Sequence, residues 1–351
     1  MTDQRSLPRA LIVLLCTASA VVTLAGIRAV GSIIGPMLLA LVLILAVAPV
    51  RTWLQSRHAP GWTLVAVPMA LVLFLLFGMV AILTLSVAQM ATLASTYGRQ
   101  FDQLVVQVQR FAAGLGIGTQ QMNQALKALD PGKIFELLSG FASGLLGVFS
   151  ALLLIVVVVL AMCLDARSFS QVLSSQAAAG RPRLIQALGS FADKTRRYLV
   201  VSTVFGLICA VLDVGALWVL GVPLPLLWGV LALITNYIPN VGFVIGLIPP
   251  ALLGLLQGGP KTLLLVIASY MVINFVIQSL VQPKFLGDAV GLSTTMTFLS
   301  LLVWAFVLGP LGALLAIPLS LLTRALLIDS DPDGEWAAAL ISGEAPAGGR
   351  P

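Results

Sequence analysis

Charged residues, histidine and cysteine are all scarce in this sequence. Only 9% of its 351 residues are Asp, Glu, Lys or Arg, whereas a soluble domain carries about 25%. His58 is the single histidine, which excludes a metal site or a catalytic triad built on several histidines of one chain. The three cysteines, Cys16, Cys163 and Cys209, lie in apolar runs without CxxC spacing. We therefore expect small buried residues and neither disulfides nor metal ligands.

The sequence also lacks the motifs of common enzymes. The stretch 254–262 reads G-L-L-Q-G-G-P-K-T, but it is not a P-loop, because Pro260 stands where the second glycine of that motif belongs. No Gly-x-Ser-x-Gly nucleophile elbow and no pair of aspartates within an apolar run occurs. We predict that the chain is not an enzyme and uses neither a cofactor nor a metal ion.

Apolar residues are abundant and make up 59% of the chain. Several apolar runs reach the ~20 residues that a helix needs to cross ~30 Å of hydrocarbon. No run alternates apolar and polar residues as the strands of a membrane barrel do. The sequence therefore predicts an all-α, polytopic helical membrane protein with about six to eight membrane-inserted segments. The expected segments are 10–27, 30–50, 62–85, 141–164, 199–220, 226–256, 261–281 and 293–327.

Positive charge indicates how the chain is oriented. The net charge is +6, and the basic residues lie mostly in short loops, where they orient a membrane protein and imply no nucleic-acid partner. This pattern places both termini, the loop 51–61 and the segment 165–197 in the cytoplasm. The polar stretch 86–139 is then a helical arm outside the membrane. The tail 329–351, rich in Gly, Ala and Pro, is expected to be disordered.

Two apolar runs are too long for one span and are broken near the middle. The runs 226–256 and 293–327 would extend to roughly 46 and 52 Å as straight helices. Pro239 interrupts the first run, and Gly309, Pro310 and Gly312 interrupt the second. Each run is either one long kinked span or a re-entrant hairpin of two half-helices. We favour hairpins, because paired units with broken helices are a recurring plan of secondary transporters.

Polar groups gather around the first break. Asn236 and Asn240 flank Pro239, whose ring leaves nearby carbonyls without helix partners. Such carbonyls are costly in lipid, but they become ligands when they line a polar cavity. Gly242 would let a backbone or a substrate approach closely. The alternative is that the two asparagines only cap the half-helices.

A second polar group lies on the run 261–281. Asn274, Gln278 and Gln282 are four residues apart and so share one face of a helix. They are either part of a substrate site or hydrogen bonds that hold helices together. The candidate substrate site is therefore Asn236, Asn240, Gly242, Asn274 and Gln278. The secondary candidates are Gln282, Thr294 and Thr295.

Asp213 is the only acidic residue inside an expected span. An intramembrane carboxylate is a functional candidate by default, and it could bind a sodium ion or a proton that drives transport. The alternative is that Asp213 reaches the membrane interface, because it stands toward one end of the segment 199–220.

Four strings of residues resemble the autoinducer-2 exporter family of bacterial membrane proteins. They are G-V-P-L-P-L-L-W-G from Gly221, N-Y-I-P-N-V-G from Asn236, Q-P-x-x-x-G-x-x-x-G-L-S-T from Gln282 and F-L-S-L-L-V-W-x-x-x-L-G-P-L-G from Phe298. The likeness is strongest over 191–327 and is closest to the quorum-signal exporter branch. It implies a multi-pass protein of the bacterial inner membrane that moves a small polar signal, such as autoinducer-2, without an ATPase. Many relatives carry Glu where this chain has Gln282, so the resemblance implies no proton coupling at that position.

The sequence thus predicts a secondary transporter that exports a small polar organic solute. Its expected partners are the lipid bilayer, the solute and either sodium or protons, and a homo-oligomer is compatible with the sequence. Sodium/proton antiport is one alternative, since other members of the resembling family are described in that way. A membrane scaffold that transports nothing and binds through the arm 86–139 is the other.

Overall fold

The computed structural model describes residues 8–78, 81–82, 85, 140, 152–173, 180–239, 241–286, 291–332 and 334–343. Every regular element within these ranges is a helix. Three of the described helices are long and apolar enough to cross a membrane: Gly31–Ser56, Pro182–Val219 and Gly242–Val281. Shorter apolar helices, among them Thr63–Gly78 and Leu154–Asp165, accompany them. The prediction of an all-α, polytopic membrane protein is confirmed.

The N-terminal helices pack against one another and against helices of the C-terminal half. α1 (Arg9–Ala29) and α2 (Gly31–Ser56) are separated by a single residue, and α2 packs against α6 (Leu152–Leu173). Ala40 of α2 and Ile155 of α6 belong to one apolar cluster with Val72, which lies in the helix Thr63–Gly78. The expected arm 86–139 lies outside the described residues.

The helix α8 (Pro182–Val219) is the longest unbroken element, with 38 residues, and it would extend over roughly 57 Å. It begins with Pro182 in the first turn, where a missing N–H costs nothing. The sequence predicted a span from 199 and a separate polar segment before it. The helix instead starts 17 residues earlier, because Ala187, Phe191 and Thr195 continue its buried face.

The first broken run folds back on itself. α9 (Pro225–Thr235) ends at the break, and α10 (Gly242–Asn274) begins after it. A Cβ at Gly242 would overlap the carbonyl oxygen of Thr235, and one at Gly246 would lie 3.6 Å from the Cα of Ala232. Successive residues of α10 therefore meet earlier and earlier residues of α9, which makes the two arms antiparallel.

α10 itself reverses at Gly259, which has φ 71° and ψ −165°. Only glycine adopts this backbone conformation readily. Before the reversal, Gly254 faces Val266 and Gly258 faces Thr262. The returning part continues as a π-helix, η1 (Phe275–Val281), and a short helix, α11 (Gln282–Leu286). The first broken run and the segment after it thus make three antiparallel arms.

The second broken run repeats this design. α12 (Thr294–Leu308) stops at Gly309, whose φ of 64° and ψ of −144° again require glycine. α13 (Pro310–Leu314) and α14 (Ala316–Arg324) then return alongside α12. A Cβ at Gly312 would overlap the carbonyl oxygen of Trp304. The indole Nε1 of Trp304 also donates to Ser320 Oγ at 3.0 Å, which ties the two arms together.

The C-terminal segment differs from the expected disorder. After the π-helix η3 (Ala325–Asp329), the helix α15 (Glu335–Ser342) forms and ends at Gly343, which is left-handed with φ 75°. The backbone N–H of Ser293 donates to the carbonyl of Ile341 at 2.9 Å. The expectation was wrong for this stretch, because W-A-A-A-L-I is a sequence of good helix formers that has a partner surface to pack against.

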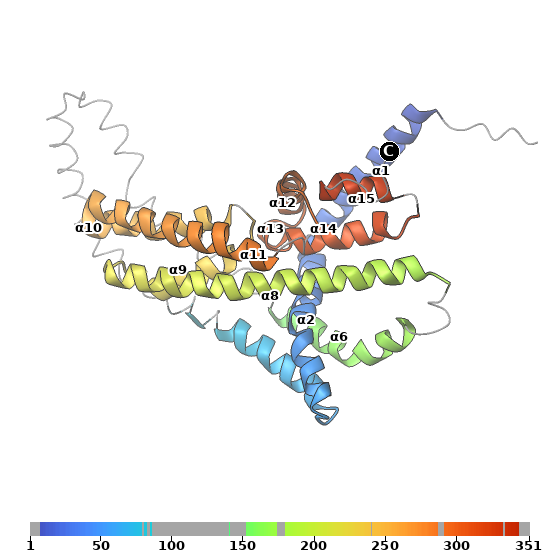
Figure 1. Cartoon of the computed structure of the whole chain (residues 1–351), viewed down its shortest axis with the longest axis horizontal. Helices are drawn as coiled ribbons and strands as arrows, with labels where there is room; N and C mark the ends of the chain where they lie inside the picture. Colours follow the sequence, from blue (N-terminus) through green and yellow to red (C-terminus); the bar gives the residue numbers. More distant parts are fainter. Residues whose placement is uncertain are drawn as a thin grey trace, which may run out of the picture.

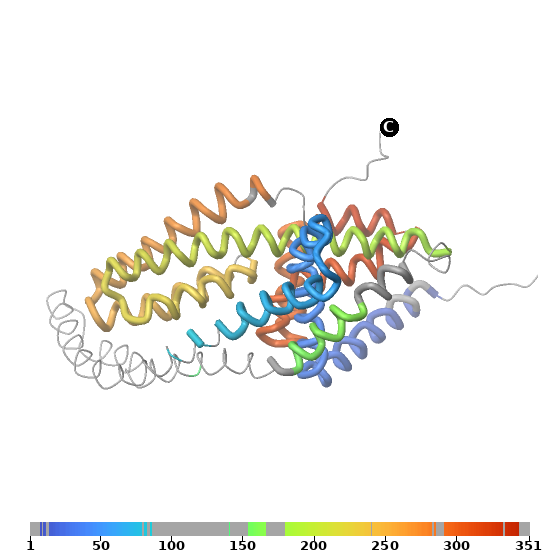
Figure 2. Tube along the Cα trace, turned by 90° about the horizontal axis from the view of Figure 1, so that it is seen from below, coloured from blue at the N-terminus to red at the C-terminus, as the bar shows by residue number. Residues whose placement is uncertain are grey.

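Both hairpins use α8 as their support. α9 and α10 lie along one end of α8, and α14 and α15 lie along the other (Figure 1). The same division is visible when the molecule is turned by 90° (Figure 2). Leu217 of α8 packs with Trp228 and Leu231 of α9 in one cluster, whereas Phe191 and Leu199 pack with residues of α14 in another. The two broken runs are therefore held on different parts of one rod.

Candidate functional site

Three helices bring a network of side-chain amides to the first break. Gln278 Nε2 donates to Asn236 Oδ1 at 2.9 Å and to Asn274 Oδ1 at 2.7 Å. Asn236 Nδ2 donates in turn to the backbone carbonyl of Ser202 on α8, at 2.8 Å. Asn274 Nδ2 donates to the carbonyl of Tyr270 at 2.8 Å. The network thus joins the end of α9, the returning arm of α10 with η1, and the middle of α8.

Local sequence explains why the amides meet. Asn236 directly follows α9, where the chain leaves the helix before Pro239. Its side chain rests against Gly206 of α8, where a Cβ would lie 2.8 Å from Asn236 Nδ2. Asn274 and Gln278 are four residues apart and so face the same way. The close approach at Gly206 therefore seats the amide of Asn236 against α8.

Four of the five predicted substrate-site residues are described, and the structure brings them to one place. Asn236, Asn274 and Gln278 share the network, and Gly242 starts α10 beside Thr235. The role of Gly242 is visible as close packing between the two arms of the hairpin. Asn240 lies outside the described residues. Pro239 stands in the break between α9 and α10, as predicted.

The amides border a small cavity. It is lined by residues of α8, α9, α10 and η1, including Cys209, Thr235, Phe243 and Gly246. Its volume is about 10 Å³, on a measure by which a single water molecule takes roughly 10–15 Å³. Asn274 is 7% exposed and Thr235 is 3% exposed. In this conformation the cavity is closed and admits about one water molecule.

Asp213 reaches this cavity from α8. Its side chain is 1% exposed, and its Oδ1 makes no hydrogen bond to any described residue. Tyr270, whose hydroxyl is likewise buried and without a partner in the described part of the chain, lines the same cavity. The expected alternative, in which Asp213 reaches the membrane interface, does not fit this burial. A buried carboxylate needs a compensating partner such as a cation, a proton or water.

Three secondary candidates lie elsewhere. Gln282 is not part of the cavity lining, although it follows Gln278 by four residues. It follows the π-helix Phe275–Val281 and begins α11, one turn further along the chain than the cavity-lining Gln278. Thr294 and Thr295 are exposed in the first turn of α12, beyond the N-cap residue Ser293. The hinge residues Gly309, Pro310 and Gly312 form the turn of the second hairpin.

Several further residues around the amides were not predicted from the sequence. Tyr198 donates its hydroxyl to the carbonyl of Tyr237 at 2.9 Å, directly at the break. The hydroxyls of Tyr237 and Thr203 are 2.6 Å apart. Cys209 stands one turn before Asp213 on α8, and this spacing was readable in the sequence. Tyr270 stands one turn before Asn274, which was equally readable.

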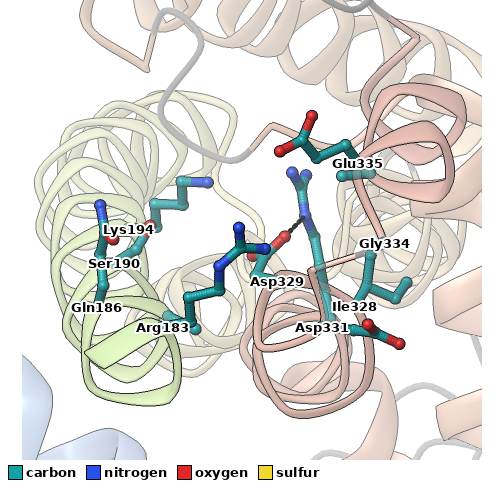
Figure 3. Close-up of a pocket in the computed structure, with 12 residues that line it drawn as sticks. Arg183, Gln186, Ser190, Lys194, Ile328, Asp329, Asp331, Gly334 and Glu335 are labelled. Atoms are coloured by element: carbon teal, nitrogen blue, oxygen red, sulfur yellow. Dashed lines mark hydrogen bonds and ion pairs between the residues drawn. The ribbon is translucent and has the colours of Figure 1, made fainter. Parts of the chain in front are cut away.

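A second, larger cavity lies at the other end of α8, between α8, η3 and α15 (Figure 3). Its volume is about 460 Å³. Arg183 and Lys194 of α8 extend into it, opposite Asp329 and Glu335 (Figure 3). Arg324 pairs with Asp329 at 3.1 Å, with side chains that are only 12% and 23% exposed. The cavity is therefore polar and carries charges of both signs.

No metal site is visible in the ranges that the structure covers, since no three His, Cys, Asp or Glu side chains converge there. Cys163 and Cys209 are buried, as predicted, whereas Cys16 is exposed. None of the three forms a disulfide in the described structure. The chemistry that the site offers is therefore amide donors and acceptors together with one buried carboxylate.

Comparison with known proteins gives consistent matches over most of the chain. A family model described as AI-2E family transporter matches residues 17–329. The putative transport protein YhhT of Escherichia coli strain K12 is 29% identical over 330 residues, covering 94% of this chain and 93% of its own. The AI-2 transport protein TqsA of the same strain is 28% identical over 325 residues, with 92% and 93% covered. A putative transport protein of Haemophilus influenzae is 29% identical over 343 residues, with 93% and 95% covered.

Proposed function

Because this chain belongs to the AI-2E family of transporters, we propose that it is a secondary transporter that exports a small polar organic solute. Autoinducer-2 is the first solute to test, since one relative is described as an AI-2 transport protein. The family is a family of transporters, so the chain is a multi-pass membrane protein that interacts with the lipid bilayer and with a solute.

The observation that supports this proposal is the amide network at the helix break. A buried side-chain amide both donates and accepts hydrogen bonds, which suits a solute with several hydroxyl or carbonyl groups. Asn236, Asn274 and Gln278 come from two separate arms and meet next to α8. Hydrogen bonds between amides alone would contribute only about 0.6 kcal/mol each to helix association. Broken helices at such a site are typical of secondary transporters.

Transport requires that the first hairpin move. Sites for small organic ligands have volumes of about 300–1,000 Å³, whereas the amide cavity has about 10 Å³. The hairpin α9–α10 is the element that can enlarge it, because its break lies directly at Asn236. Parting α9 from α8 would break the bond from Asn236 to Ser202 and free the amides for a solute. We propose that the closed cavity is the empty, occluded state of the transport cycle.

The proposed orientation follows from charge. Arg183, Lys194 and Arg324 lie around the polar cavity, and an excess of Lys and Arg marks the cytoplasmic side. On this basis we propose that the protein lies in the bacterial inner membrane, with the polar cavity and both chain termini on the cytoplasmic side. Export would then begin at the end of α8 that carries the polar cavity. The two hairpins would be re-entrant, each entering and leaving the membrane on one side.

Reconstituted transport tests the main proposal. Proteoliposomes that contain the full chain should take up labelled autoinducer-2 or another member of a panel of small polar solutes. The variants Asn236→Ala and Gln278→Ala should lower the initial rate at least ~10-fold, which corresponds to about 1.4 kcal/mol. Gln257→Ala is the matched control, because Gln257 is an exposed amide remote from the network. Equal rates for all three variants would refute the amide site.

The burial of Asp213 favours a second candidate function, the exchange of sodium for protons. Its carboxylate shares the cavity with the amides, and amide oxygens are suitable ligands for a hard cation. The test is sodium-driven proton movement in proteoliposomes, followed with a pH-sensitive dye. Exchange that disappears in Asp213→Asn would support this function. Solute uptake that is insensitive to sodium and pH gradients, and unchanged in Asp213→Asn, would exclude it.

A further inference from the structure

One buried face of α8 carries polar side chains from the polar cavity to the amide cavity. Thr195, Ser202 and Asp213 are spaced by 7 and 11 residues, which are close to two and three turns of an α-helix. The three side chains therefore point in nearly the same direction. Lys194, which lines the polar cavity, directly precedes Thr195 and lies about 100° around the helix from this stripe. The distance along the helix from Thr195 to Asp213 is roughly 27 Å, which nearly equals the thickness of the hydrocarbon core.

Two polar atoms of this stripe are buried without a partner among the described residues. Thr195 is 0% exposed, and Ser202 and Asp213 are each 1% exposed. Thr195 Oγ1 and Asp213 Oδ1 form no hydrogen bond to a described residue, whereas the hydroxyl of Ser202 faces that of Tyr198. Unpaired buried groups are rare in native proteins, and each one indicates a bound water, an ion or a functional role. Two of them on one face of one helix indicate a common cause.

Tyr198 interrupts the stripe between Thr195 and Ser202. It is 5% exposed, and its hydroxyl donates to the carbonyl of Tyr237 at 2.9 Å. Tyr237 belongs to the break of the first hairpin, so this bond holds the break against α8. The polar cavity lies on one side of Tyr198, and the amide network lies on the other. Breaking this bond would leave the contact between the hydroxyls of Thr203 and Tyr237, at 2.6 Å, as the remaining side-chain tether between α8 and Tyr237.

We propose that this face of α8 is the route from the polar cavity to the amide site, and that Tyr198 is its gate. The route rests on the transport function proposed above, because it supplies the site with solute and water. When Tyr198 and Thr203 both release Tyr237, the break moves away from α8 and the stripe becomes continuous. Thr195 lies on the polar-cavity side of the gate, and Cys209 lies on the amide side. This order is what an experiment can test.

Thiol labelling measures access along the stripe. The full chain in membrane vesicles is exposed to a membrane-impermeant methanethiosulfonate, added to one face or the other. Native Cys209 is the target beyond the gate, after Cys16 and Cys163 are changed to Ala. Thr195→Cys, with all native cysteines replaced, is the target before the gate. Val204→Cys in the same background is the matched control, since Val204 is on the exposed face of α8 and is 49% exposed.

We expect the reagent to modify Thr195→Cys at least ~10-fold faster than Val204→Cys when it is added from the polar-cavity side, because a thiol reacts in water and not in lipid. Tyr198→Phe removes the hydroxyl that binds Tyr237. It should speed the labelling of Cys209 by about fivefold or more from that side and leave Thr195→Cys unchanged. These targets keep Cys209 as the native residue, so the key measurement does not depend on a new side chain in the core.

Two results would overturn the route. One is that the reagent labels Cys209 no faster than it labels Val204→Cys, both in the protein with native Tyr198 and in the Tyr198→Phe variant. The other is labelling of Cys209 from the opposite face only. Because labelling needs no knowledge of the solute, it fails independently of the transport assay. Solute uptake without the expected labelling would keep the transporter and reject the route along α8.

Discussion

Gly242→Ala is the sharpest test of the first hairpin. The added Cβ would overlap the carbonyl oxygen of Thr235, and a backbone atom cannot turn aside as the end of a flexible side chain can. The arms α9 and α10 must part, and overpacking of this kind costs about 1–3 kcal/mol. For chains of 150–250 residues, each kcal/mol lowers the Tm by about 2–4 °C. We therefore expect a loss of several degrees in a thermal unfolding assay of the purified protein in detergent.

Gly215→Ala is the control for this measurement. Gly215 lies inside α8, and a Cβ there would meet no atom within 4 Å. Alanine is favoured over glycine in a helix by roughly 0.5–1 kcal/mol, so this variant should keep or raise the Tm. Gly312→Ala should resemble Gly242→Ala, because its Cβ would overlap the carbonyl oxygen of Trp304. If Gly242→Ala unfolds at the same temperature as Gly215→Ala, the close antiparallel packing of the hairpin is wrong.

Three further outcomes follow from contacts in the structure. Gln278→Leu leaves two amide oxygens without their donor, and should destabilise the protein by about 1–3 kcal/mol in denaturant titrations. Trp304→Phe and Ser320→Ala each remove the same hydrogen bond, which contributes about 0.5–1.5 kcal/mol to stability. The double variant should therefore lose no more stability than either single variant. Additive losses would show that the bond is absent. Arg324→Gln removes a half-buried ion pair and should lower stability by about 1–3 kcal/mol. Arg196→Gln removes an exposed ion pair and should change stability by less than about 1 kcal/mol.

The sequence predicted those features that depend on local chemistry. Apolar runs formed helices, because a chain in lipid must satisfy its backbone hydrogen bonds internally. The runs broke at Pro239 and at Gly309, because proline lacks an N–H and glycine adopts a backbone conformation that other residues avoid. Asn274 and Gln278 were correctly predicted to lie together. Their spacing of four residues brings the two amides into contact even though Asn274 ends α10 and Gln278 lies in the π-helix η1.

Other features depend on contacts that no local pattern contains. Gln282 follows a π-helix and does not line the amide cavity, and no residue in F-V-I-Q-S-L-V predicts a π-helix. The start of α8 at Pro182 was readable in principle, because Ala187, Phe191 and Tyr198 recur at helical spacing. Its charged residues led to the expectation of a cytoplasmic segment, 165–197, separate from the span. Basic residues mark the cytoplasmic side of a helix as readily as they mark a loop.

The length of α8 has a mechanical consequence. Each hairpin packs against a different stretch of α8. If one hairpin moves together with its stretch of α8, the other hairpin must move too unless α8 itself bends. A tilt of 10° about the midpoint would carry each tip of a helix of this length sideways by roughly 5 Å. Motion at the end of α8 beside the polar cavity is thereby transmitted to the end beside the amide cavity. A single helix thus couples the movements of the two hairpins.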